Sequence, residues 1–148
     1  MGEALNQGVE GSNPFGLAFL HMISSLEEWI LELRASNKLI LVEGQNDKKA
    51  LEELGITNVM TVSKTPIYKT VEKIREQEVI IFTDLDKEGK KFYSTLRHHL
   101  QKRGVKIDRV FREFLLKETK VTTIEGLPHY LRTTVATASK IGTDVLKL

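Results

Sequence analysis

Three carboxylates follow two apolar segments of this sequence that have the composition of buried strands. Residues 79–82 form a short apolar run rich in β-branched side chains, and Asp84 and Asp86 come directly after it. Alternate residues of an extended chain point to the same side, so both carboxylates are expected to leave the strand end together. Residues 38–42 form a second such run, followed by Glu43. If the two strands are neighbours, the three acids meet at the carboxyl edge of a sheet, where open α/β folds bind ligands.

Clustered acids of this kind predict a divalent metal site. Carboxylates repel one another unless a cation joins them, and Mg²⁺ prefers oxygen ligands, usually one or two carboxylates together with a phosphate. Glu43, Asp84 and Asp86 are therefore the candidate metal ligands, with Mg²⁺ as the expected ion and Mn²⁺ as its substitute. The alternative for the two aspartates is an ordinary solvated turn, because acidic pairs are common in loops.

The helix expected over residues 87–103 begins beside the aspartates and is rich in basic side chains. Its single acid is Glu88, and its first turn offers free backbone N–H groups, which favour phosphate. Acids for a metal beside bases for a phosphate backbone are expected of an enzyme that acts on a polyanion. The alternative is a solvated helix face. The candidate phosphate contacts are Lys48, Lys87, Lys90, Lys91 and Arg97.

The hydrophobic periodicity predicts alternating strands and helices. The expected strands cover 38–43, 57–62, 79–83 and 105–111, and the expected helices cover 26–35, 46–54, 66–77, 87–103 and about 123–131. This alternation predicts an α/β fold with about four mainly parallel strands and helices on both faces, with 38–43 and 79–83 as the central strands. Trp29 lies on the apolar face of the first helix, which favours a place in the core over nucleic-acid stacking.

Composition and length predict one folded domain over residues 22–132, followed by a C-terminal tail over 133–148. The 148 residues include no cysteine, which excludes disulfides and thiolate zinc sites. No apolar run approaches the roughly 20 residues of a membrane span, and a secretion signal is not recognisable, so a cytoplasmic protein without a membrane partner is expected. Residues 1–21 are rich in glycine and lack amphipathic periodicity. They are interpreted either as a disordered or vector-derived extension, or as translated upstream DNA preceding a natural start at Met22.

The two acidic segments together resemble the signature motifs of the Toprim domain. The motifs are Val-Glu-Gly-Gln-Asn-Asp at 42–47 and Asp-Leu-Asp-Lys-Glu-Gly-Lys-Lys at 84–91, and the resemblance covers about residues 38–110. The family includes DNA primases, type IA and type II topoisomerases, OLD-type nucleases and the bacterial nuclease that matures 5S ribosomal RNA. The resemblance implies a Toprim, Rossmann-like fold. By the same resemblance Glu43 transfers a proton, Asp84 and Asp86 hold Mg²⁺, Gly44, Asp47 and Gly89 support the site, and Lys91 lies near the phosphate.

The chain lacks the additional parts of several family members. It leaves no room for the strand-cleaving domain of a topoisomerase or the zinc module of a primase. The resemblance therefore favours a metal-dependent nuclease that processes structured RNA, with RNA preferred over DNA. Primase-like nucleotidyl transfer and a non-catalytic nucleic-acid-binding scaffold are the alternatives. A ribosomal or other protein partner is also considered, because so small a chain would leave substrate contacts for it to supply.

Overall fold

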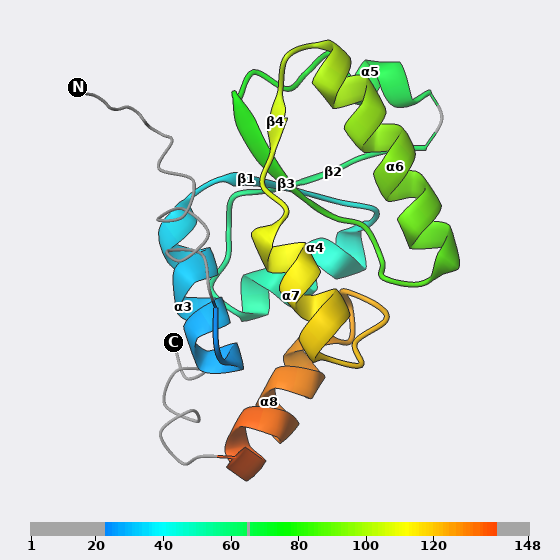
Figure 1. Cartoon of the computed structure of the whole chain (residues 1–148). Coiled ribbons are helices and arrows are strands. Elements are labelled where there is room, and N and C mark those ends of the chain that lie inside the picture. The colour runs from blue at the N-terminus through cyan, green and yellow to red at the C-terminus, as the bar shows by residue number, and fades with distance from the viewer. Residues whose placement is uncertain (1–22, 65, 139–148) are drawn as a thin grey trace, which may run out of the picture.

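The computed structural model describes residues 23–64 and 66–138 (Figure 1). The predicted extension over 1–21, with the proposed start at Met22, lies outside the described residues, as does the part of the predicted tail beyond residue 138. Among the residues described, no helix is both long and apolar enough to cross a bilayer.

The centre of the molecule is a four-stranded parallel sheet in the order β2-β1-β3-β4. Its strands are β1 (Leu39–Val42), β2 (Val59–Thr61), β3 (Glu78–Phe82) and β4 (Lys106–Ile107). The predicted α/β fold with a mainly parallel sheet and with β1 and β3 as its central strands is confirmed. Val42 is opposite Phe82 in the β1–β3 register, so the chain segments that carry Glu43 and Asp84 leave the sheet side by side.

Alternating side chains of the central strands divide the core into two layers. Ile40, Val42, Ile80 and Phe82 face the helices α3 (Leu26–Ser36), α4 (Gln45–Glu53), α7 (Val110–Glu118) and α8 (Leu127–Ala138). Leu39, Leu41, Val79 and Ile81 face the helices α5 (Ile67–Val71) and α6 (Lys87–Lys102). Figure 1 shows the two helix groups on opposite sides of the sheet. This two-sided burial explains why the central strands are continuously apolar.

Trp29 is a core residue, as its position on the apolar face of α3 predicts. Its side chain is fully buried, and its ring lies 6.1 Å from that of Phe82 in a stacked arrangement. The indole N–H donates to the main-chain oxygen of Phe111 at 3.0 Å, which satisfies the polar atom inside the core.

The predicted strand over 105–111 is wrong for most of its length. Only Lys106 and Ile107 pair with β3, and α7 begins at Val110. The Asp108 carboxylate accepts the N–H of Val110 at 3.0 Å and so satisfies a donor at the start of the helix. Phe111 and Leu115, four residues apart, are both buried. The apolar run was therefore the beginning of an amphipathic helix rather than a strand.

Several helix boundaries also differ from those predicted. The helix α5 ends at Val71 instead of about residue 77. Beyond it the backbone hydrogen bonds join residues three apart, as in a turn, for example from the N–H of Ile74 to the oxygen of Val71. The N-cap of α4 is Gly44 rather than Asn46 or Asp47. The last helix, α8, begins at Leu127 and reaches Ala138, later at both ends than expected.

Candidate functional site

Glu43 connects the ends of the two central strands. Its Oε2 accepts the main-chain N–H of Asp84 at 3.0 Å, and its Oε1 lies 3.9 Å from Nζ of Lys64. Lys64 follows β2 and is more than half exposed, and its Nζ lies 5.7 Å from the centre of the Phe92 ring. The carboxylate of Glu43 is therefore held at the sheet edge beside Asp84, with one exposed cation close to it.

The two aspartates each give one carboxylate oxygen to a backbone donor. Oδ1 of Asp84 accepts the N–H of Ile124 at 3.0 Å, and Oδ1 of Asp86 accepts the N–H of Gly89 at 2.8 Å as the N-cap of α6. The second oxygen of each aspartate has no hydrogen-bond partner within 23–64 and 66–138. In that same part of the chain, no group of three or more histidine, aspartate or glutamate side chains is arranged to hold a metal ion.

Gly89 brings α6 into direct contact with the turn that carries the acids. A Cβ atom at this position would lie 1.9 Å from the main-chain oxygen of Asp84, which excludes any side chain without backbone movement. The hydroxyl of the buried Thr83 donates to the main-chain oxygen of Gly89 at 2.8 Å. The turn and the first turn of α6 therefore form one packed unit, which aims the N-terminus of the helix at the acidic edge.

Asp47 is the most buried acid of this edge. Its side chain is 9% exposed, and its Oδ2 accepts the N–H of Gly44 at 3.2 Å. Burial, together with the negative charges of Asp84, Glu43 and Glu125, raises the pKa of Asp47 to about 6. The hydrogen bond from Gly44 opposes that increase. Burial is the largest cause, and the neighbouring carboxylates add to it, so a cation bound at this edge would lower the pKa of Asp47.

The structure adds two cations and one loop that sequence reasoning missed. Lys64 approaches Glu43, and Arg112 of α7 is buried beneath the acidic turn, where its guanidinium donates to the main-chain oxygens of Thr83 and Asp84. The loop between α7 and α8 supplies the Ile124 N–H to Asp84, and its Thr122 carbonyl accepts the N–H of Leu85 at 2.9 Å. These residues are distant in sequence from the acids that they contact and belong to no recognisable motif. The sequence around them therefore did not predict a place in the site.

The predicted phosphate-binding residues lie on the two helices that start at the acidic edge. Lys87, Lys90 and Lys91 are exposed on the first turns of α6, and Lys48 is half-buried near the start of α4. Arg97 lies farther along α6, half-buried, with its guanidinium carbon 5.7 Å from the centre of the Tyr93 ring. The structure thus places the lysines near the acids and Arg97 away from them on the same helix.

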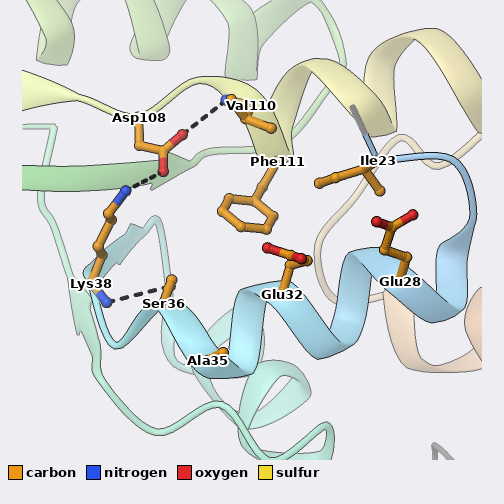
Figure 2. A pocket seen from close by; sticks show the side chains of 9 residues that line it. All are labelled: Ile23, Glu28, Glu32, Ala35, Ser36, Lys38, Asp108, Val110 and Phe111. Carbon is orange, nitrogen blue, oxygen red and sulfur yellow. Dashed lines mark hydrogen bonds and ion pairs between the residues drawn. The ribbon is translucent and has the colours of Figure 1, made fainter. Parts of the chain in front are cut away.

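A hollow of about 220 Å³ lies at the other end of the sheet, between α3 and the start of α7 (Figure 2). One cation of the lining is paired: Nζ of Lys38 lies 2.6 Å from Oδ2 of Asp108 and 3.4 Å from Oε1 of Glu78. Glu28 and Glu32 also line the hollow, and among the described residues neither contacts a cation. Lys38 precedes β1, whereas Glu43 follows it, so the two charged regions occupy opposite edges. The lysine at this edge is therefore already paired with two carboxylates.

Comparison with known proteins places the chain in a family. The Toprim domain profile matches residues 37–111. A UPF0292 protein of Methanocaldococcus jannaschii is 31% identical, over 76% of this chain and 91% of the relative. One from Pyrococcus abyssi is 34% identical, over 72% and 84%. A solved structure from Aquifex aeolicus is 36% identical and superposes with a TM-score of 0.64, covering 70% of this chain and 98% of the other. The chain therefore belongs to the Toprim domain family.

Proposed function

We propose that this protein carries out Mg²⁺-dependent phosphodiester chemistry on nucleic acid, as a nuclease that processes structured RNA. The observation that carries the proposal is the junction of the two family motifs at one sheet edge, where Glu43 Oε2 accepts the Asp84 N–H at 3.0 Å. The basic first turns of α6 begin directly beside that junction. This arrangement supports the proposal, because metal chemistry on a polyanion needs acids and basic side chains on one surface.

The chemistry of the donors at this edge fits a hard divalent cation, and the carboxylates must move closer together to share one, because the described side chains are not arranged to hold it. Each aspartate keeps one carboxylate oxygen that no described residue occupies, and the charges of Asp84 and Glu43 contribute, after burial, to the raised pKa of Asp47. Asp84 and Asp86 would hold the ion, with Glu43 beside them and Asp47 adding charge behind them. When bound, Mg²⁺ supplies electrostatic stabilisation of the negative charge that develops on a reacting phosphoryl group. Mn²⁺ is expected to replace it.

The roles of the side chains follow from their positions. Glu43 is partly exposed at the edge, so it is the candidate for proton transfer to or from a reacting oxygen. Lys87, Lys90 and Lys91 project from the first turns of α6, where the helix dipole also favours phosphate. Lys48 and Arg97 are proposed as further contacts to the phosphate backbone of the nucleic acid. A ribosomal or other protein partner would extend the surface available to a structured RNA.

Two alternative functions use the same surface. Primase-like nucleotidyl transfer would need the same acids and metal, with a nucleotide as the second substrate. A non-catalytic nucleic-acid-binding scaffold would need the lysines alone. The acids oppose the scaffold alternative, because mutually repelling carboxylates at a nucleic-acid surface weaken binding unless a cation joins them.

The test separates metal binding from proton transfer. Asp84→Asn and Asp86→Asn remove a charged oxygen ligand, so Mn²⁺ affinity measured by calorimetry and cleavage of a structured RNA should fall together. Glu43→Gln should largely keep Mn²⁺ binding while lowering turnover roughly 10²–10⁴-fold, the usual contribution of general acid–base catalysis. Loss of Mn²⁺ binding in Glu43→Gln would make Glu43 a ligand. Wild-type protein that binds RNA without any divalent-metal site would instead support the scaffold.

The nucleic-acid surface is tested by its salt dependence. Replacing Lys90 and Lys91 with alanine should weaken RNA binding and flatten the log–log salt dependence by roughly one unit for each lost phosphate contact. Lys102→Ala is the matched control, because Lys102 is exposed in the last turn of the same helix, away from the acidic edge. An equal loss in the control would show a general charge effect rather than a site. Comparing RNA with DNA of the same sequence tests the preference for RNA.

A further inference from the structure

Arg112 is a buried charge in an unfavourable helical position. It lies in the first turn of α7, where the helix dipole disfavours cations, and its side chain is only 3% exposed. Burying a guanidinium is costly unless its donors are satisfied. It also lies one residue beyond the segment that matches the Toprim domain. The position therefore needs an explanation other than helix formation or the family motifs.

The contacts of Arg112 are directed at the turn that carries the acids. Its Nη1 donates to the main-chain oxygen of Thr83 at 2.5 Å, and its Nη2 donates to that of Asp84 at 3.0 Å. The planar guanidinium can reach two adjacent carbonyl groups at once, which a single ammonium cannot do with the same geometry. On its other side, the guanidinium carbon lies 4.5 Å from the centre of the Tyr93 ring, which comes from α6. The turn is thus held between α6 and α7.

The charge of Arg112 is not used in an ion pair. Among the residues that the structure describes, Arg112 donates to neutral carbonyl groups and contacts no carboxylate directly. Burial lowers the pKa of Arg112, and Tyr93, Asp84 and Glu43 raise it. Arginine stays protonated under such opposing influences. A fixed positive charge therefore lies behind the acids, on the protein side of the edge.

We infer that Arg112 is a positioning residue that fixes the Thr83–Asp84 turn and acts as an internal counter-charge for the acidic edge. With this guanidinium in place, the turn keeps its geometry and the acids can gather before any external cation arrives. The consequence for metal binding rests on the proposed function. The fixation of the turn is independent of the proposed function, because it can be measured on the metal-free protein.

The first measurement is amide hydrogen exchange of the metal-free, full-length protein. The N–H groups of Asp84, Leu85 and Ile124 are bonded at 3.0, 2.9 and 3.0 Å within the clasped turn and report directly on it. Arg112→Met should speed their exchange at least tenfold more than that of core amides such as Ile80. Arg112→Lys keeps a positive charge but cannot donate to both carbonyl oxygens with the same geometry. Its amides at the turn should therefore exchange nearly as fast as those of Arg112→Met. Should Arg112→Met fail to fold, Arg112→Lys and Tyr93→Leu, which removes the ring supporting the guanidinium, provide the same readout.

The second measurement is Mn²⁺ affinity by calorimetry, at a temperature where each variant is folded. Arg112→Lys keeps the positive charge and loses only the fixation of the turn, so it should bind Mn²⁺ at least tenfold more weakly than wild type. The matched control is Lys38→Met, which removes a cation, one that is ion-paired at the opposite edge, and which should leave Mn²⁺ affinity unchanged. Exchange that stays at the wild-type rate in the folded arginine variants overturns the inference. Wild-type protein without Mn²⁺ binding, but with faster exchange in those variants, overturns the proposed function and leaves the inference standing.

Discussion

The two edges of the central sheet gather charged side chains in opposite ways. At the amino edge, Lys38 lies between Asp108 at 2.6 Å and Glu78 at 3.4 Å, so each charge has a partner. At the carboxyl edge, Glu43, Asp84 and Asp86 are oriented mainly by backbone N–H groups, and the nearest exposed cation, Lys64, is 3.9 Å from Glu43. At the first edge a lysine contacts two acids directly, whereas among the described residues no cation side chain pairs with either aspartate carboxylate of the second.

The kind of partner that each carboxylate has distinguishes a structural charge cluster from a candidate ligand site. Paired charges lower the need for a ligand, and the hollow in Figure 2 shows such a cluster beside an available cavity. Backbone donors orient a carboxylate without removing its charge, which leaves it available to a cation. Asp47 is an acid of the second kind, because its carboxylate accepts the N–H of Gly44, whereas Asp108 is bonded to a lysine. Burial and the neighbouring acids raise the pKa of Asp47 to about 6.

The largest expected effect comes from filling the space beside Asp84. Gly89→Ala would place a Cβ 1.9 Å from a main-chain oxygen, so α6 must separate from the acidic turn. We expect a loss of several kcal/mol in unfolding free energy, comparable to severe overpacking or worse. Gly104→Ala is the control at the other end of α6, where φ is +82° but no atom lies within 4 Å, so roughly 1 kcal/mol should be lost. Equal losses in urea unfolding would contradict the role assigned to Gly89.

Removing the lysine that pairs with the acids at the amino edge should cause the next largest loss of unfolding free energy. Lys38→Met leaves the largely buried Asp108 carboxylate without its cation. Because Asp108 also bonds the Val110 N–H, it cannot simply turn to solvent, and we expect roughly 2 kcal/mol of destabilisation. Denaturant unfolding measures this change. A loss of Mn²⁺ binding in this variant would show that the two edges are not independent.

Asp47 predicts a pH dependence specific to the acidic edge. Its folded pKa of about 6 exceeds the unfolded value of 3.8, so its contribution to stability is fully present below about pH 4 and is lost as pH rises through 6. Asp47→Asn keeps an oxygen that can accept from Gly44 but cannot ionise. After allowing for solvent screening, the variant should be more stable than wild type by roughly 1 kcal/mol at pH 7 and equal to it near pH 4.

Thermal unfolding of wild type and Asp47→Asn across pH 4–7 checks this, because other titrating groups cancel in the difference. Mg²⁺ should narrow the gap at pH 7 if it neutralises the edge. A constant difference between the two proteins at all pH values would contradict the titration of Asp47.

The smallest effect is expected from Lys64. Its side chain is 56% exposed and 3.9 Å from Glu43, so Lys64→Ala should change the unfolding free energy by less than roughly 0.5 kcal/mol. Measured beside Lys38→Met, it compares a loose ion pair at one edge with a tight one at the other. A loss of unfolding free energy as large as that of Lys38→Met would mean that the acidic edge depends on Lys64 for folding.

The sequence by itself determined the central architecture and the position of the acids. The apolar runs that became β1 and β3 are continuous because both faces of those strands are buried, and helical periodicity identified α6 with its basic first turns. Since Glu43 and Asp84 follow these strands directly, a parallel pairing sufficed to bring them to one edge. These features depend on local periodicity and chain order, which the sequence contains explicitly.

The tertiary structure alone decided which charges are paired and what holds the acids in place. Val105 to Phe111 fits a strand locally, yet burial of Phe111 and Leu115 against the sheet selects a helix from Val110. Asp108 binds Lys38, 70 residues away, and Asp84 is held by contacts from Glu43, Arg112 and Ile124, which are 41, 28 and 40 residues distant. Contacts of this range are set by how helices pack on the sheet, and no periodicity in the chain encodes them.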